Sequence, residues 1–441
     1  MPNRRANDVS VVGLGKLGLC LAAVLSSRGF RVKGVDLDAS KVEAINRGVS
    51  PFYEPGLEKL LRKVGQRLVA SISYSTAIEK TNATFVVVPT PSDDSGAFSL
   101  RYVIKAMESV GKELAEIRRY HLVVLTSTVM PGSMDGTVKP LLEGASGKIC
   151  GRDFGLCYNP EFIALGDVIG GLLRPDFILI GESDTKAGLY LSEIQHRICT
   201  NSPPIERMKF VNAELSKIAL NSFVTMKISF ANTLAEISEK THGGDVDVIT
   251  SAIGRDKRIG SAYLKGALGY GGPCFPRDNI AFARYAKSVD AQARLAEATH
   301  IVNIDQTERL IMQMLKTGLQ LNMGVGVLGL SYKPNTSVVE QSQSLLLAQR
   351  LSELGHEVNV FDPAAVENSK AVLGDKVSYF RSARACVKAS DYVILATPWP
   401  EFKNLNSRDF EGKTVFDCWR FLRNEVKMMP TYFSVGRGED E

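Results

Sequence analysis

Residues 269–278 combine a thiol with glycines and prolines, and this segment is the part of the sequence best suited to covalent chemistry. It reads Gly269-Tyr270-Gly271-Gly272-Pro273-Cys274-Phe275-Pro276-Arg277-Asp278. Pro276 suits the first turn of a helix, which places Cys274 just outside the N-terminus of the helical pattern that follows. The positive end of the helix dipole favours thiolate over thiol there, and glycines let a bulky ligand approach the backbone. A buried structural cysteine needs no such surroundings, so we interpret Cys274 as a nucleophile.

A second group with chemical potential lies on one predicted helix, where Glu214, Lys217 and Asn221 are separated by three and four residues. Lys217 and Asn221 therefore share a helix face. An ammonium next to a carboxamide is able to stabilise an oxyanion. Such a pair is more often a solvated helix surface, so the interpretation as an oxyanion site depends on the nucleophile.

A glycine motif near the N-terminus predicts a dinucleotide site. Gly13-Leu14-Gly15-Lys16-Leu17-Gly18 follows an apolar run and opens a helical pattern. Gly13 permits the tight turn, Gly15 lets the backbone approach a pyrophosphate, and Gly18 allows close helix packing. The alternative is a glycine-rich turn that binds nothing.

Asp36 indicates which dinucleotide is expected, because it ends the next strand eighteen residues after Gly18. A carboxylate here accepts hydrogen bonds from ribose hydroxyls and repels a 2′-phosphate, which favours NAD over NADP. Arg31 and Lys33 lie nearby in the sequence and are the reason for caution. Pro89-Thr90-Pro91 ends a later strand, at the edge where such sheets bind ligands.

These residues need a scaffold of parallel strands and helices. An apolar strand, a helix at residues 17–27 and a second strand form a βαβ start. Further strands continue a parallel sheet until Asn201-Ser202-Pro203-Pro204 interrupts the pattern. The strands expected in this part are residues 9–12, 31–35, 84–88 and 122–125.

The rest of the chain predicts a helical middle and a second α/β unit. From Ile205 to about His300 the pattern is helical and includes a long connecting helix. A helix at residues 345–354 and strands at 325–329, 357–361, 392–397 and 414–416 follow. We therefore predict two Rossmann-like doubly wound domains (1–203 and 303–441) joined by a central helical domain (204–302), with the two α/β halves as candidate copies of one plan.

Composition excludes several classes of function. The 441 residues, 44% of them hydrophobic, suffice for several domains of ~150 residues. A net charge of +5 without a block of like charges predicts no nucleic-acid binding, and no apolar stretch approaches the ~20 residues of a membrane span. The first ten residues lack the apolar core of a secretory signal, so we expect a cytoplasmic protein. Seven cysteines without a C-x-x-C pair and five histidines without ligand spacing predict neither a disulfide framework nor a metal site.

Further motifs, in a fixed order, make the chain resemble the UDP-glucose and GDP-mannose dehydrogenase family from about Val9 to Phe421. They add to the glycine motif and the cysteine loop. They are Ile45-Asn46-Arg47-Gly48, Glu54-Pro55-Gly56-Leu57, Ser127-Thr128-Val129-Met130-Pro131-Gly132, Tyr158-Asn159-Pro160-Glu161-Phe162, Arg258-Ile259-Gly260 and Gly329-Leu330-Ser331-Tyr332-Lys333.

The resemblance implies an NAD-dependent, four-electron oxidation of the C6 alcohol of a UDP-sugar. UDP-glucose is the first expectation, with UDP-glucuronate, an acid used in polysaccharide biosynthesis, as the product. The first oxidation would give an aldehyde, and the second would turn a thiohemiacetal on Cys274 into a thioester, which water cleaves.

The same resemblance implies roles for the other catalytic residues. Lys217 and Asn221 would stabilise the developing oxyanion. Asp278 and Thr128 would hold the water that relays the alcohol proton, and Glu161 would assist thioester hydrolysis.

Binding residues are implied in the same way, for a nucleotide-sugar substrate and a homodimer formed through the central helix. The cofactor set is Gly13, Gly15, Lys16, Leu17, Gly18, Asp36, Lys41, Pro89, Thr90, Ser127 and Thr128. The substrate set is Phe162, Lys217, Asn221, Arg258, Tyr263, Leu264, Lys265, Gly271, Phe275, Tyr332 and Lys333. Arg258 would reach the partner's substrate and Lys333 would meet the diphosphate, although the alternatives are a surface arginine and an exposed loop lysine.

Three departures from the family pattern concern the choice of sugar. Leu165 precedes Gly166 where a second glutamate is usual, and Thr336-Ser337-Val338-Val339-Glu340-Gln341-Ser342 lacks the usual aspartate and arginine. Arg277 replaces the commoner lysine, which keeps the charge but changes its geometry.

Alternative functions stay open at this point. UDP-N-acetylglucosamine, UDP-N-acetylmannosamine and GDP-mannose are alternative substrates. A two-electron hydroxyacid or alcohol dehydrogenase would not need Cys274. A catalytically silent scaffold would bind NAD and the nucleotide sugar but consume neither.

Overall fold

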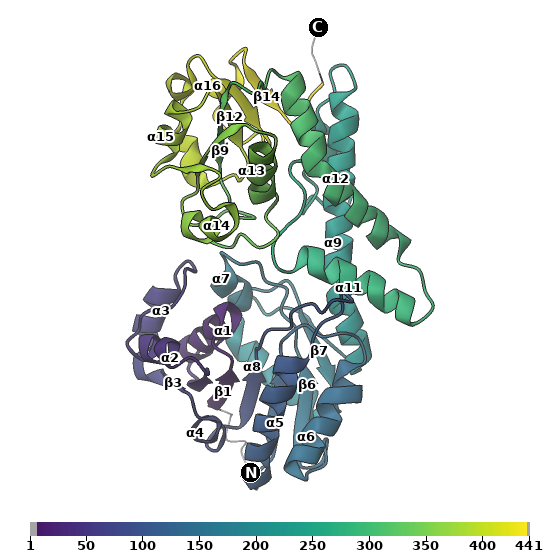
Figure 1. Ribbon diagram of the computed structural model, residues 1–441. Helices are drawn as coiled ribbons and strands as arrows, with labels where there is room; N and C mark the ends of the chain where they lie inside the picture. The colour runs from purple at the N-terminus through teal and green to yellow at the C-terminus, as the bar shows by residue number, and fades with distance from the viewer. Residues whose placement is uncertain (1–6, 439–441) are drawn as a thin grey trace. The chain divides into compact units, whose positions relative to one another are not determined.

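The first sheet lies in the first of two compact units, which meet in the sequence between Ala219 and Leu220. The computed structural model describes residues 7–438. The strand order is β3-β2-β1-β4-β5-β6-β7-β8, and Figure 1 shows the sheet among its helices. The strands are β1 (Asp8–Val12), β2 (Arg31–Val35), β3 (Leu68–Ser71), β4 (Ala83–Val86), β5 (His121–Leu125), β6 (Phe154–Tyr158), β7 (Ile178–Glu182) and β8 (Ile205–Met208).

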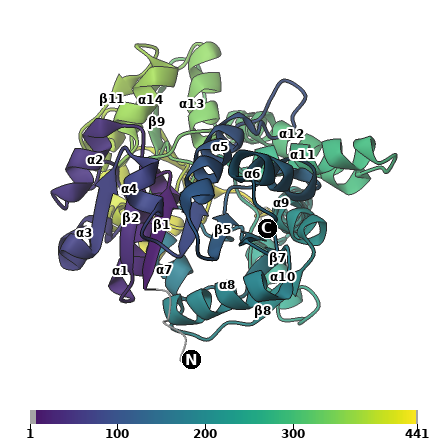
Figure 2. The same ribbon diagram turned by 90° about the horizontal axis from the view of Figure 1, so that it is seen from below.

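Helices cover both faces of this sheet, as Figure 2 shows. Val9 and Val11 of β1 pack with the helices of one face, whereas Val12 packs with those of the other, because successive strand residues point to opposite sides. One face carries α1 (Lys16–Ser27), α3 (Leu57–Val64), α7 (Val168–Leu173) and α8 (Thr185–Ile198). The other carries α4 (Tyr74–Ile78), α5 (Arg101–Glu116) and α6 (Lys139–Ser146). The remaining short helices of this unit are α2 (Ala39–Asn46), a 3-10 helix (Gly65–Arg67) and a π-helix (Met134–Val138).

Two features of this sheet correct the sequence prediction. β7 pairs with β6 in the antiparallel direction, so the sheet is not parallel throughout. Ile205–Met208 form β8, parallel to β7, and the helical pattern expected from Ile205 begins only at Phe210. The physical reason is the pairing with β7, since four residues after a proline pair contain too little periodicity to separate strand from helix.

The helical segment between the two sheets in the chain contains one long helix and three others. α9 (Phe210–Glu239) crosses the boundary between the units. The second unit then contains α10 (Val246–Ile253), α11 (Phe275–Ser288) and α12 (Arg294–Lys316). The expected long connecting helix is therefore present.

The second sheet is parallel throughout and has the order β11-β10-β9-β12-β13-β14. This order matches β3-β2-β1-β4-β5-β6 of the first sheet. Its strands are β9 (Gly324–Leu328), β10 (Glu357–Phe361), β11 (Ser378–Tyr379), β12 (Tyr392–Leu395), β13 (Thr414–Asp417) and β14 (Tyr432–Ser434). Its helices are α13 (Gln343–Glu353), α14 (Val366–Leu373), α15 (Ala383–Lys388), α16 (Asn424–Lys427) and two 3-10 helices (Pro400–Asn404 and Ser407–Phe410).

The turn after the first strand is built the same way in both sheets. The N–H of Gly13 donates to the carbonyl of Val35, and that of Gly329 donates to the carbonyl of Phe361, both at 2.8 Å. Asp36 accepts from the next N–H of its turn, and Asp362 does the same. The two sheets thus repeat one plan down to the glycine and the aspartate.

The predicted fold class is confirmed: the chain is an α/β protein with two Rossmann-like units and a helical segment between them in the sequence. No helix within residues 7–438 is both long and apolar enough to cross a membrane. In the same part of the chain, no three His, Cys, Asp or Glu side chains gather as a metal site.

Candidate active site

The glycine turn of the first unit has the geometry that a bound pyrophosphate requires. Gly13 has φ +89°, and a Cβ there would lie 2.2 Å from the carbonyl oxygen of Val87. A Cβ on Gly18 would lie 1.9 Å from the carbonyl oxygen of Gly13. By contrast, a Cβ on Gly15 would have no atom within 4 Å. Gly15 is the N-cap residue of α1, and no side chain caps this helix N-terminus. The open space in front of this helix N-terminus therefore fits an anionic dinucleotide.

Asp36 retains acceptor capacity for ribose hydroxyls. Its carboxylate accepts from the N–H groups of Leu14 (2.9 Å) and Asp38 (3.0 Å), one on each oxygen. Arg31 pairs with Asp8, and Lys33 donates to the carbonyl of Thr76, so both cations that raised caution are engaged elsewhere. The set fits NAD better than NADP.

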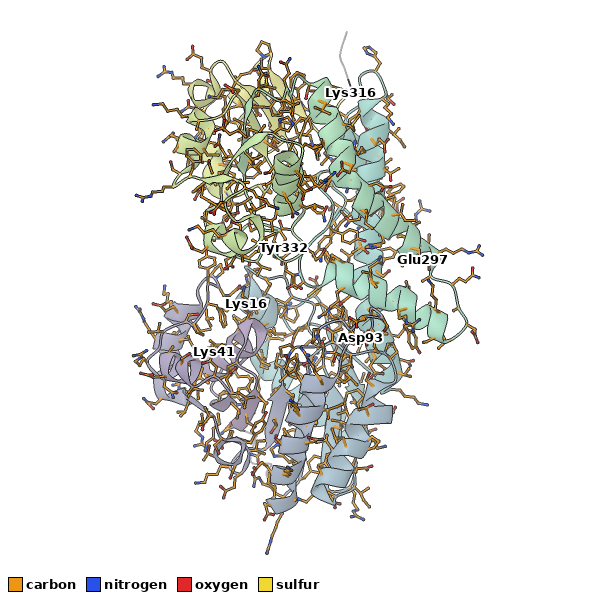
Figure 3. All side chains as sticks on the ribbon, in the orientation of Figure 1. Lys16, Lys41, Asp93, Glu297, Lys316 and Tyr332 are labelled. Atoms are coloured by element: carbon orange, nitrogen blue, oxygen red, sulfur yellow. The ribbon has the colours of Figure 1, made fainter. Side chains whose placement is uncertain are left out.

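Two lysines lie near this turn, as Figure 3 shows for Lys16 and Lys41. The Nζ of Lys41 is 3.9 Å from a carboxylate oxygen of Asp36. Burial lowers the pKa of Lys16, and the negative charge of Glu54 opposes this shift. Leu17, the next residue, is partly buried.

The ends of β4 and β5 are connected by Ser127. Its hydroxyl accepts from the N–H of Val88 (2.9 Å) and donates to the carbonyl of the same residue (2.6 Å). Thr90 is buried in the loop after β4, and Thr128 is partly buried in the loop after β5. These loops lie at the carboxyl edge of the parallel strands, where such sheets bind ligands.

Glu214, which the sequence predicted on the same helix as Lys217, hydrogen-bonds to the loop after β5. Its side chain is fully buried and accepts from the N–H groups of Gly132 (2.7 Å) and Met134 (2.8 Å). Burial raises the pKa of Glu214. Its role is to position the loop that begins at Ser127, which spacing along one helix did not indicate.

Lys217 and Glu161 meet in the first unit. The Nζ of Lys217 donates to the backbone carbonyl of Glu161 (2.7 Å) and lies 4.6 Å from the ring centre of Phe162. Desolvation by the surrounding protein raises the pKa of the Glu161 carboxyl to about 7, while the charge of Lys217 opposes this shift. A carboxyl with this pKa exchanges protons readily near neutral pH and suits a general base.

Glu54 explains one motif and one departure from the family pattern. Its buried carboxylate accepts from the N–H groups of Gly166 (3.1 Å) and Val168 (3.0 Å), at the start of α7. Leu165, just before Gly166, packs against the apolar core around α1. The position where the family pattern led us to expect a second acid is therefore occupied by a packed apolar side chain.

Cys274 occupies the expected place in the second unit. It is exposed and is the N-cap residue of α11, with Pro276 in the first turn. Burial lowers the pKa of the Arg277 guanidinium, but the negative charges of Asp278, of ionised Cys274 and of Glu340 together raise it further. Arg277 thus adds a positive charge to that of the helix dipole, and both favour the thiolate.

Asp278 is the centre of a buried group in the same unit. Its carboxylate is fully buried and accepts from the Nδ2 of Asn221 (2.6 Å) and from the Nε of Arg277 (3.0 Å). The sequence singled out Asn221 and Asp278 separately, and the structure brings them together. Asn221 is bonded here to an acid, whereas Lys217 on the same helix is bonded in the loop that contains Glu161.

The substrate residues expected in the second unit surround the cysteine loop. Tyr263 and Phe275 meet edge to face, with ring centres 5.9 Å apart. A Cβ on Gly272, which has φ +84°, would lie 2.5 Å from the ring of Tyr332, a residue labelled in Figure 3. The Nζ of Lys333 is 5.9 Å from the centre of that ring.

The other members of the substrate set differ in exposure. Leu264 is buried, whereas Lys265 is exposed. Arg258 is 88% exposed and forms an ion pair with Asp256, two residues away. The ion pair and hydrogen bonds described for the Arg258 side chain therefore all go to Asp256, within its own turn.

Arg420 is a residue that sequence reasoning missed. It is buried and has φ +54°, and its guanidinium pairs with Asp247 and donates to the carbonyls of Val435 and Gly266. An arginine three residues after a buried strand, β13, was the available signal. Arg420 supports the backbone between Lys265 and the cysteine loop.

Comparison with protein families covers most of the chain. Residues 7–199 match the NAD binding domain of the UDP-glucose/GDP-mannose dehydrogenase family. Residues 211–305 match the central domain of that family, and residues 326–424 match its UDP binding domain. The predicted cofactor NAD is confirmed by this match, as is the resemblance recognised from the motifs.

Individual relatives agree with the family. The chain is 37% identical to UDP-glucose 6-dehydrogenase AglM of Haloferax volcanii, over 90% of this chain and 93% of that protein. It is 32% identical to GDP-mannose 6-dehydrogenase of Pseudomonas syringae, over 94% and 97%. Among solved structures, a UDP-glucose dehydrogenase from Pyrobaculum islandicum superposes with a TM-score of 0.90 at 36% identity, covering 99% of both chains.

The glycine turn with Asp36, the thiol at the start of α11 and the three matched domains lead to the same assignment. The chain belongs to the UDP-glucose/GDP-mannose dehydrogenase family and is an NAD-dependent nucleotide-sugar dehydrogenase.

Proposed function

We propose that the protein oxidises the C6 alcohol of UDP-glucose to the carboxylate of UDP-glucuronate. The observation that carries this proposal is Cys274, an exposed thiol at a helix N-terminus with Arg277 close by, because an enzyme that stops at the aldehyde needs no thiol. We prefer UDP-glucose as the substrate because relatives such as the H. volcanii protein are named UDP-glucose 6-dehydrogenases.

The glycine turn and Asp36 would hold NAD, which would supply the hydride acceptor for each of the two oxidations. In the first, the C6 hydroxyl loses its proton to a water held by Asp278 and Thr128. The bond between Asp278 and Asn221 fixes the orientation of that carboxylate. Lys217 and Asn221 stabilise the negative charge that develops on the oxygen.

The second oxidation proceeds on Cys274. Its sulfur adds to the C6 aldehyde, a C–S bond forms, and the carbonyl oxygen takes up a proton to give a thiohemiacetal. Loss of a hydride and of that proton leaves a thioester. Water then attacks the thioester carbon and passes one proton to Glu161. The C–S bond breaks to release the thiolate, and the new carboxylic acid loses its remaining proton to solvent to give the carboxylate.

The proposal is tested by counting NADH per sugar consumed. We expect two NADH and one UDP-glucuronate for each UDP-glucose, measured by absorbance and mass spectrometry. A ratio of one would mean a two-electron dehydrogenase, and binding without NADH formation would mean a silent scaffold. UDP-N-acetylglucosamine, UDP-N-acetylmannosamine and GDP-mannose, run in parallel, test the choice of sugar.

The pKa of Glu161 gives an expected pH dependence. Because the general base must be deprotonated and its pKa is about 7, thioester hydrolysis is expected to slow as the pH falls below that value. Glu161→Gln is expected to lose this limb of the profile and to accumulate enzyme acylated on Cys274. Intact-protein mass spectrometry measures the adduct, and absence of the adduct in a slow Glu161→Gln variant would contradict the assigned role.

We also propose that two copies associate through α9. Phe223, Phe230 and Ile237 are 58%, 51% and 55% exposed, and they repeat every seven residues along the helix. Exposed apolar residues at this spacing form the seam of a two-stranded helix contact. In this proposed dimer, Arg258 reaches across the interface toward the partner's substrate, a role that the family resemblance implies.

Phe230→Asp is expected to convert the dimer to a monomer in light scattering, because it would bury a charge in that seam. Phe230→Leu, which keeps the apolar surface, is the control. A monomeric wild-type protein, or a dimer that tolerates the aspartate, would contradict the proposal.

A further inference from the structure

The backbone leading to Cys274 is buried, and side chains hydrogen-bond to it instead of a neighbouring strand. Asn303 of α12 accepts from the N–H of Tyr270 (2.6 Å) and donates to its carbonyl (3.1 Å). Further back, Gln306 donates to the carbonyl of Ala267 (2.5 Å), and Asn232 accepts from the N–H of Ala267 (2.8 Å). A buried loop needs such partners, because unpaired backbone groups are costly away from water.

Asn303 pairs with Tyr270 as a residue of an adjacent antiparallel strand would, by exchanging two bonds with one residue. Its side chain is buried, although asparagine is a poor choice for the apolar face of a helix. Gly269 makes room for it, since a Cβ there would lie 2.6 Å from the Oδ1 of Asn303. Asparagine does not stabilise the helix itself, so we infer that the contribution of Asn303 is to hold the loop at Tyr270.

The other side of the loop is packed against residues 332–341. A Cβ on Gly271 would lie 2.2 Å from the carbonyl oxygen of Gln341, and Gly272 lies directly against the ring of Tyr332. Residues 270–272 are therefore confined between α12 and this second loop. Only Pro273, whose φ angle is restricted, separates them from Cys274, so a shift of Tyr270 is transmitted to the thiol.

We propose that Asn303 is a positioning residue for Cys274: its paired bonds to Tyr270 fix the loop from which the thiol attacks the aldehyde. The proposal rests on the function proposed above, in which the thiol acts only in the second oxidation. Loss of Asn303 therefore impairs the aldehyde step and spares the alcohol step.

The test compares Asn303→Ala with Gln306→Ala. Both variants remove a buried amide of α12, but Gln306 supports Ala267, seven residues before Cys274. The C6 aldehyde of UDP-glucose, supplied as substrate, reports the thiol-dependent step, and a single turnover with UDP-glucose reports the first hydride transfer. We expect Asn303→Ala to slow aldehyde oxidation about 10²-fold, the scale for a misplaced reacting group, with the first transfer little changed. Gln306→Ala is expected to slow neither step selectively.

Amide hydrogen exchange of residues 269–274 checks the cause without any turnover. Exchange at Tyr270 is expected to accelerate in Asn303→Ala and not in Gln306→Ala. If Asn303→Ala does not fold, Asn303→Asp, which keeps the acceptor and loses the donor, is expected to show a smaller loss confined to the aldehyde step.

Equal slowing of both steps, the same selective loss in Gln306→Ala, or faster exchange with unchanged aldehyde oxidation would overturn the positioning role. Failure of the proposed function is distinguishable, because it appears in the wild-type enzyme as one NADH per sugar.

Discussion

Replacing Cys274 with serine is expected to stop the reaction after the first oxidation, so that one NADH and no acid form. The serine hydroxyl is a far weaker nucleophile at neutral pH, because neither the dipole of α11 nor Arg277 can ionise it as they ionise a thiol. Loss of a covalent nucleophile reduces turnover by orders of magnitude, and we expect acid formation to fall about 10³-fold or more. Rapid quench with separate assays of NADH, aldehyde and acid measures this.

Cys150→Ser is the matched control. Cys150 is a partly exposed thiol of the first unit, away from any helix N-terminus. We expect this variant to produce two NADH per sugar, as the wild type does. Acid formation by Cys274→Ser within tenfold of the wild type would show that the thiol carries no intermediate.

Replacing Lys217 with methionine is the change expected to have the second largest effect. Methionine retains much of the apolar stem but removes the buried ammonium that donates to the loop of Glu161 and Phe162. Losing one donor to a developing oxyanion typically costs about 10²–10³ in rate, and we expect a loss of this size in kcat.

The same variant has a second, independent signature in its pH profile. The positive charge of Lys217 lowers the pKa of Glu161 against the effect of desolvation, so its removal raises that pKa further above its ordinary value. The base is then protonated over a wider range, and the acid limb of the profile moves to higher pH. Lys240→Met, an exposed lysine just after α9, is the control. A loss in kcat below tenfold, or an unshifted limb, would contradict the role of Lys217.

The two variants, Cys274→Ser and Lys217→Met, change residues of different units. Glu161, Lys217 and the glycine turn belong to the first unit, and Cys274, Asn221 and Asp278 belong to the second. α9 carries Lys217 on one side of the unit boundary and Asn221 on the other. The two variants therefore probe the two groups independently.

The sequence by itself determined the features that depend on near neighbours along the chain. The glycine turn was recognisable from the spacing of Gly13, Gly15 and Gly18 in front of a helical pattern, and the distance along the chain to Asp36 was visible without a structure. Cys274 was recognisable because a proline and a helical pattern follow it directly. Four strands of each sheet, β1, β2, β4 and β5 of the first and β9, β10, β12 and β13 of the second, were located within a few residues for the same reason, since apolar runs of this length bounded by turns are a local signal. The other strands of both sheets were not predicted.

Only the tertiary structure decided the contacts between distant segments. The bond between Asn221 and Asp278, the bonds of Glu214 to Gly132 and Met134, and the pairing of Asn303 with Tyr270 each join residues tens of positions apart. The raised pKa of Glu161 likewise comes from desolvation by the folded protein around it. The antiparallel pairing of β7 with β6, and the formation of β8 beside β7, also depend on which strand each segment pairs with. A single sequence records which residues are apolar and where turns occur, whereas these features depend on which distant backbone and carboxyl groups folding brings within hydrogen-bonding distance.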